Sequence, residues 1–163
     1  MTKKTKVIIA SILVIILIVG CIIFFPKKSD RLTVTDIHNH VVLGKTTKKD
    51  LEERYGKPSK INTNKKEVSE IRDYWNGDSG EGTLNDQLDD LGYWESLKFD
   101  KNFPKKNVNG YEFYVQCSGK NLGVNYVRFF FWKDRVYDIQ FGNKITNESA
   151  AKRDKYLKQI YGD

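Results

Sequence analysis

The chain has 163 residues, with 28 Lys and Arg against 21 Asp and Glu, so its formal net charge is +7 at pH 7. This length suffices for one globular domain and excludes a (β/α)8 barrel, a two-domain dehydrogenase and a protein kinase. Apolar residues make up 39% and charged residues 30% of the sequence, a balance typical of a folded domain and too apolar for a disordered chain.

The positive charge is concentrated at the N-terminus. Residues 1–31 contain six basic residues and one acid, a net charge of +5, whereas the rest of the chain carries only +2. The high overall charge therefore does not indicate a nucleic-acid-binding domain, and we expect no nucleic-acid partner.

Residues 7–25 form an uncharged apolar run of 19 residues. As an α-helix this run would be about 29 Å long, close to the ~30 Å hydrocarbon core of a bilayer, so we predict a membrane anchor over residues 1–26. Three Lys or Arg residues flank the run on each side, so the positive-inside rule does not set its orientation. A short basic stretch before a single apolar run is typical of signal-type insertion, which predicts a single-pass cell-membrane protein with an extracytoplasmic C-terminal domain.

The two cysteines bear on how the chain is anchored. The sequence Leu-Ile-Val-Gly-Cys at residues 17–21 is similar to the lipobox of bacterial lipoproteins, which makes Cys21 a candidate lipidation site. The apolar run continues after Cys21, which favours an uncleaved helix, so both anchoring modes stay open. Cys117 lies in a strand-like stretch and cannot pair with a cysteine in the anchor, so we expect no disulfide and a buried thiol.

We expect residues 27–43 to be a tether and lead-in, and residues 44–163 to form the extracytoplasmic domain. Thr47 and Asp50 have the spacing of a capping box, which predicts the start of a short helix. Leu51 and Tyr55 would form its buried side, and a left-handed Gly56 before a proline would end it.

The middle of the chain is acidic, with ten acids against three basic residues over residues 66–100. We predict a strand over residues 68–75, a glycine-rich loop over 77–82 and a short helix that starts at Leu84 and is interrupted at Gly92.

The C-terminal third has the clearest pattern. One strand is predicted to place alternate side chains on one face: Tyr111, Phe113, Val115 and Cys117. Residues 125–132 and 135–141 are predicted to form a hairpin with a two-residue turn at Lys133 and Asp134. A closing helix is expected over residues 148–161, with Asn147 as N-cap and Leu157 and Ile160 facing inward. The order of elements predicts an α+β fold: an N-terminal transmembrane helix, then a small antiparallel sheet of three or four strands packed with short helices.

Residues 44–58 begin with Gly-x-Thr and end with Gly-x-Pro around the capped helix. This segment resembles the helix motif of the SmpA/OmlA-type outer-membrane assembly lipoproteins and of β-lactamase-inhibitor-like domains. In those folds antiparallel strands rich in Trp and Tyr follow the helix, and Tyr74, Trp75 and residues 111–141 occupy corresponding places. The resemblance covers 15 residues. It implies an anchored or secreted binding module without catalysis and transfers no partner-contacting residue, while residues 76–110 and the C-terminal helix depart from the compact pattern.

Two short motifs could be mistaken for catalytic or metal sites. On a strand, Asp36, His38 and His40 would share a face and could converge on an ion, but the sequence has no other histidine to complete a ligand set, so we expect no metal. The sequence Gly-Asp-Ser-Gly at residues 77–80 copies the nucleophile segment of chymotrypsin-like proteases. Too little chain precedes Ser79 to build the first barrel of such a protease, so we interpret this match as coincidence.

The acids of residues 67–100 do not match the spacing of a calcium loop, and we expect no cofactor. They are interpreted as a solvated surface, with a docking surface for a basic partner as the alternative.

The run from residue 126 to 132 has bulky side chains on both faces. Val127, Phe129 and Phe131 alternate with Tyr126, Arg128, Phe130 and Trp132. The strand is either covered on both sides or has one open aromatic face. Because an arginine between aromatic rings is accommodated more easily near solvent, we predict Tyr126, Arg128, Phe130 and Trp132 as the partner-binding face.

These observations favour a membrane-tethered, extracytoplasmic, non-catalytic module that binds a protein partner, of the inhibitor, immunity or envelope-assembly type. Two alternatives stay open. One is a small cell-envelope enzyme that uses the acidic loop or His38 and His40; the other is a structural subunit of an envelope or secretion complex.

Overall fold

The structure is a computed structural model that describes residues 28–76, 83–104 and 110–161, with the side chains of residues 74–76 left out. The expected anchor, Cys21 and the Gly-Asp-Ser-Gly motif lie outside the described residues. Within the described ranges, no helix has the length and apolar character that a bilayer span needs.

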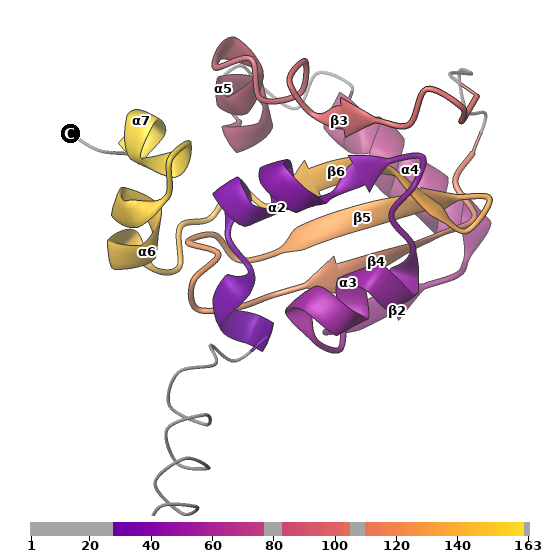
Figure 1. Cartoon of the computed structure of the whole chain (residues 1–163), viewed down its shortest axis with the longest axis horizontal. Coiled ribbons are helices and arrows are strands. Elements are labelled where there is room, and N and C mark those ends of the chain that lie inside the picture. The colour runs from indigo at the N-terminus through magenta and orange to yellow at the C-terminus, as the bar shows by residue number, and fades with distance from the viewer. Residues whose placement is uncertain (1–27, 77–82, 105–109, 162–163) are drawn as a thin grey trace, which may run out of the picture.

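The centre of the fold is a four-stranded antiparallel sheet (Figure 1). Its strands lie in the order β2 (Lys60–Asn62), β4 (Phe113–Cys117), β5 (Val127–Trp132) and β6 (Arg135–Phe141). The β5–β6 turn has Lys133 at φ 50° and Asp134 at φ 57°, the left-handed pair that a two-residue hairpin requires. The prediction of an α+β fold with a small antiparallel sheet and short helices is confirmed.

One face of the sheet forms the main core with α2 (Val34–His40) and α3 (Lys48–Tyr55), which lie in front of it in Figure 1. The side chains that β5 turns to this face are all buried: Val127, Phe129 and Phe131. The ring of Phe129 stacks on that of Tyr55, with 6.4 Å between the centroids. This face of β5 is therefore core, as the alternation of its residues predicted.

The opposite face is covered in part by α4 (Lys65–Asn76), where the sequence predicted a strand over residues 68–75. Val68 and Ile71 are three residues apart and lie on one side of this helix, against the rings of Tyr114 and Phe130. Val68, Ile71 and Trp75 recur at i, i+3 and i+7 in the sequence, which is the period of a helix, so the strand assignment was wrong although the spacing itself indicated a helix.

Helix α3 follows the prediction closely. Thr47 is its N-cap, and Thr47 and Asp50 form both hydrogen bonds of the capping box. Leu51 and Tyr55 are buried. Gly56 ends the helix at φ 89° and ψ −173°, a positive φ that glycine adopts without strain, although this ψ lies outside the left-handed helical region.

Residues 28–43, which were expected to be part of a tether and lead-in, form ordered elements of the fold. A 3-10 turn, η1 (Lys28–Arg31), leads into α2, and Thr33 caps α2 by accepting a hydrogen bond from the Asp36 N–H. Four apolar side chains of this region are 1% exposed or less: Leu32, Val34, Ile37 and Val41. The described domain therefore includes this segment as part of its core.

Residues after α2 add a second small sheet. β1 (Val42–Leu43) pairs in parallel with β3 (Lys98–Phe99), which the sequence did not predict. Helix α5 (Leu84–Asp90), which precedes β3 in the chain, is capped by Thr83 and ends just before Gly92, as expected.

The predicted closing helix is two short helices, α6 (Glu148–Arg153) and α7 (Leu157–Tyr161), although Asn147 is the N-cap of α6 as predicted. The helical path is interrupted at Asp154, a residue that is only 5% exposed. One of its carboxylate oxygens accepts hydrogen bonds from the N–H groups of Tyr156 at 2.9 Å and Leu157 at 3.2 Å. The other accepts from the Thr35 N–H at 2.8 Å, so the break ties the C-terminal helices to α2.

Removal of residues 1–26 should leave the thermal unfolding of the domain unchanged, because the described core contains none of these residues. Removal of residues 1–43 should abolish cooperative unfolding, because it takes four core side chains. In the longer chain, Ile37→Ala should cost about 2–5 kcal/mol of stability. Circular-dichroism melts of the three proteins test this; aggregation of the chain that lacks residues 1–26 would contradict the assigned boundary.

Candidate functional site

The prediction that Phe130 belongs to the partner-binding face is wrong, because this residue is buried. Its side chain is 0% exposed, and its ring lies 5.3 Å from that of Tyr111 and 5.7 Å from that of Tyr114. Helix α4 covers this group with Val68 and Ile71. Tyr111 was expected to share a face with Phe113, Val115 and Cys117, but it packs on this opposite side instead.

Trp132 is half-buried at the end of β5 and belongs to a cluster of rings. Its centroid lies 5.3 Å from those of Phe103 and Tyr137, and the Lys133 ammonium lies 4.8 Å over it. Phe103 packs so closely on Gly44 that a Cβ there would lie 2.6 Å from the Phe103 Cβ. Trp132 therefore contributes to the packing of residues 100–104 on the hairpin, and only part of it faces solvent.

Arg128 is the most distinctive residue of this face, because its guanidinium is held on several sides. Nε donates to Gln116 Oε1 at 3.1 Å and Nη1 donates to Gln140 Oε1 at 3.3 Å. The guanidinium carbon lies 4.4 Å from the ring centroid of Tyr126 and 5.2 Å from that of Tyr114. Two amides and two rings thus fix the position of a half-buried cation.

The register of the sheet brings these groups together. Gln116 of β4 and Gln140 of β6 lie directly opposite Arg128 on the two neighbouring strands. Gln140 is only 6% exposed, so its amide has little freedom to move. This row cannot be read from the sequence, because strand pairing must be known before Gln116, Arg128 and Gln140 can be recognised as neighbours.

Arg54 and Arg72 are half-buried like Arg128, but each of them is paired with an acid. Arg54 makes two hydrogen bonds to Asp36, and Arg72 pairs with Asp138. In the described part of the chain no carboxylate forms an ion pair with Arg128, and its Nη2 makes no hydrogen bond. A partly desolvated cation without a counter-charge is stabilised when an anion reaches it.

Lys60 adds a second positive charge to this surface. Its ammonium lies 6.0 Å from the ring centroid of Tyr114, on the side of the sheet that carries Arg128. We define the Arg128 site as six residues of the four strands and their ends: Lys60, Tyr114, Gln116, Tyr126, Arg128 and Gln140. Helix α4 covers the neighbouring part of the face at Phe130, so the site lies beside that helix.

The two histidines lie on helix α2, not on a strand, and have separate partners. His40 Nδ1 is 3.2 Å from Asp36 Oδ1, whereas His38 Nε2 is 2.9 Å from Ser96 Oγ. Burial is the largest single effect on the pKa of Asp36 and would raise it, but the hydrogen bonds and charge of Arg54, with smaller contributions from Tyr55 and His40, together hold that pKa below its usual value. Among the residues that the structure describes, no group of three or more His, Cys, Asp or Glu side chains could hold a metal ion.

Cys117 is buried, as predicted, and its thiol is free in the described part of the chain. Burial, assisted by the charge of Glu52, raises the pKa of its thiol to about 11. At neutral pH this thiol is therefore protonated and a poor nucleophile.

Comparison with protein families, curated proteins and solved structures finds no match for this chain. The geometry of the Arg128 site is therefore the main basis for a functional interpretation.

The difference between the two kinds of β5 residue can be measured. Phe129→Ala and Phe130→Ala should each lower the free energy of unfolding by about 3–5 kcal/mol, because both rings are fully buried. Arg128→Ala should cost about 1.5–3 kcal/mol, the net value of hydrogen bonds that involve a charged group. Urea titrations of the three variants test this. If Arg128→Ala lowered the free energy of unfolding as much as Phe130→Ala does, the role of Arg128 would be to stabilise the fold and not to bind a partner.

Proposed function

We propose that this protein is a non-catalytic binding module that docks an acidic surface of a protein partner on the Arg128 site. The observation that carries the proposal is the guanidinium of Arg128, which two glutamines and two tyrosine rings hold in place although no acid of the described part pairs with it.

The arrangement suits recognition because the side-chain entropy of Arg128 is already lost in the free protein. A flexible arginine loses side-chain entropy when it binds, whereas this guanidinium is fixed by Gln116 and Gln140 before the partner arrives. A carboxylate that reached its outer edge would form charge-assisted hydrogen bonds. Arginine and tyrosine are also the residue types that dominate binding energy at the centre of interfaces.

The proposal includes a membrane tether and an extracytoplasmic location. It rests on the apolar run at residues 7–25 and the basic stretch before it. An anchored inhibitor, an immunity protein and an envelope assembly factor all work by holding a binding domain in the compartment where the partner acts. The resemblance of residues 44–58 to assembly lipoproteins and inhibitor-like domains supports this class.

The enzyme alternative has less support from the site geometry. His38 forms a hydrogen bond with Ser96, whereas His40 lies beside Asp36. The Asp36 carboxylate also forms an ion pair with Arg54. The carboxylate beside His40 is therefore held by Arg54 and is not free to act as a second catalytic group.

Arg128→Ala should weaken capture of the partner by about 1–3 kcal/mol, the range of an interface hot spot. The experiment uses the tagged full-length chain in detergent-solubilised membranes, with chemical cross-linking and quantitative mass spectrometry. Arg128→Lys keeps the charge but loses the fixed fork, so it should recover only part of the binding.

Arg153→Ala is the matched control, because Arg153 is exposed on α6 and bonds only to the Ser149 hydroxyl in the described chain. Equal recovery of the partner by wild type and Arg128→Ala would refute the proposed site. A partner that co-purifies in a fixed ratio with both proteins would instead favour the structural-subunit alternative.

Cys21→Ser separates the two anchoring modes. If the apolar run is an uncleaved helix, the variant should keep its mass and its membrane retention, because insertion does not need the thiol. Metabolic labelling with a fatty acid, followed by gel electrophoresis, tests this. Loss of a lipid label together with accumulation of a larger precursor would show that Cys21 is lipidated.

A further inference from the structure

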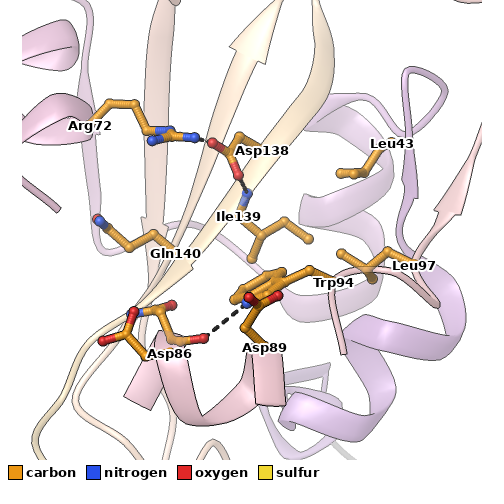
Figure 2. A pocket seen from close by; sticks show the side chains of 10 residues that line it. Leu43, Arg72, Asp86, Asp89, Trp94, Leu97, Asp138, Ile139 and Gln140 are labelled. Atoms are coloured by element: carbon orange, nitrogen blue, oxygen red, sulfur yellow. Dashed lines mark hydrogen bonds and ion pairs between the residues drawn. The ribbon is translucent and has the colours of Figure 1, made fainter. Parts of the chain in front are cut away.

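A cleft of about 430 Å³ lies along the outer edge of β6, between α4 and α5. Figure 2 shows its two kinds of wall. The apolar wall consists of Leu43, Trp94, Leu97 and Ile139. The polar wall includes Arg72 and Asp138 on one side and the α5 acids Asp86 and Asp89 on the other.

The backbone of β6 at this edge is already occupied, so an extended strand cannot pair with it. The Asn85 side chain forms hydrogen bonds with both backbone groups of Phe141: its Oδ1 accepts from the N–H at 3.0 Å and its Nδ2 donates to the C=O at 2.8 Å. Asp138 Oδ1 accepts from the Ile139 N–H at 2.8 Å. Val136 bonds through both backbone groups to Gly44 and Thr46. The cleft is therefore suited to a side chain and not to β-augmentation.

The charges of the cleft are not equally available. Asp138 is hydrogen-bonded by Arg72, by the Tyr111 hydroxyl and by the Ile139 N–H. Asp86 is engaged in the capping box of α5 with Thr83. Within the described residues the carboxylate of Asp89 makes neither a hydrogen bond nor an ion pair, and Figure 2 shows it beside the indole of Trp94.

Arg72 is a second group with unused bonding capacity at this wall. Its Nε bonds to Asp138, but Nη1 is buried and has no hydrogen-bond partner among the residues that the structure describes. A buried donor without a partner is costly, so an acceptor that enters with the occupant of the cleft would be stabilised. An occupant with both a cationic end and amide oxygens meets these two needs, which a bare cation does not.

We propose that the cleft binds a lysine side chain of the partner whose acidic surface docks on Arg128. The aliphatic stem would lie on Trp94, Leu97 and Ile139, and the ammonium would reach Asp89. Gln140 connects the two sites, because it lines the cleft and its Oε1 accepts from Arg128. This inference rests on the proposed function and adds a basic residue, next to an acidic one, to the chemistry of the partner.

The test uses Nα-acetyl-lysine amide as probe and the full-length protein in detergent, labelled with 5-fluorotryptophan. The 19F resonance of Trp94 is identified with Trp75→Phe and Trp132→Phe variants. We expect a saturable shift of this resonance that weakens at high salt. Nα-acetyl-norleucine amide, which has the same stem without the charge, should bind at least about fivefold more weakly.

Asp89→Asn should weaken binding of the lysine amide by about fivefold or more. Asp90→Asn is the matched control, because Asp90 has the same charge on the same helix but does not line the cleft. Absence of a saturable shift, equal binding of the norleucine amide, or equal loss in both variants would overturn the proposal. The first two outcomes use the unaltered residues and do not depend on the folding of a variant.

Arg128→Ala should leave binding of the lysine amide intact, because Arg128 itself does not line the cleft. Loss of the partner in Arg128→Ala with no probe binding would refute the cleft alone. Probe binding with no effect of Arg128→Ala on the partner would refute the Arg128 site alone.

Discussion

The fold depends on one constraint: strand β5 carries large apolar side chains on both of its faces, and both faces must be buried. Phe129 and Phe131 on one face and Phe130 on the other are 0% exposed, so each side of this strand must be covered. Helices α2 and α3 cover the first face and α4 covers part of the second. A sheet covered by one helical layer could not bury all three rings.

The same constraint explains why a charged residue lies in the middle of this sheet. Helix α4 covers the Phe130 end of the second face, and β5 continues beyond it to Arg128. The cross-strand glutamines Gln116 and Gln140 satisfy part of the guanidinium, and two tyrosine rings flank it. A polar row beside an apolar cluster thus gives one rigid surface with two chemically different halves.

Local signals in the sequence predicted the local structure well. The capping box at Thr47, the hairpin turn at Lys133 and Asp134 and the core face of β5 depend on neighbouring residues, and all three are confirmed. Features that depend on distant contacts were missed. The break at Asp154 and the row through Arg128 require a known packing partner, which periodicity does not supply. The helix over residues 65–76 was missed for another reason, because its apolar residues do recur at the helical period.

Because the folded domain begins at Lys28, it can extend only a short distance from the proposed membrane anchor. η1 begins at Lys28, and the side-chain amide of Asn121 donates to the Asp30 carbonyl, which holds this end of the domain. On the proposed anchoring, only Pro26 and Lys27 separate the apolar run from the folded chain, a span of at most about 11 Å. The domain would then rest against the bilayer, and recognition would resemble an encounter in two dimensions, where a short connection raises the effective concentration of membrane-proximal partners and excludes distant ones.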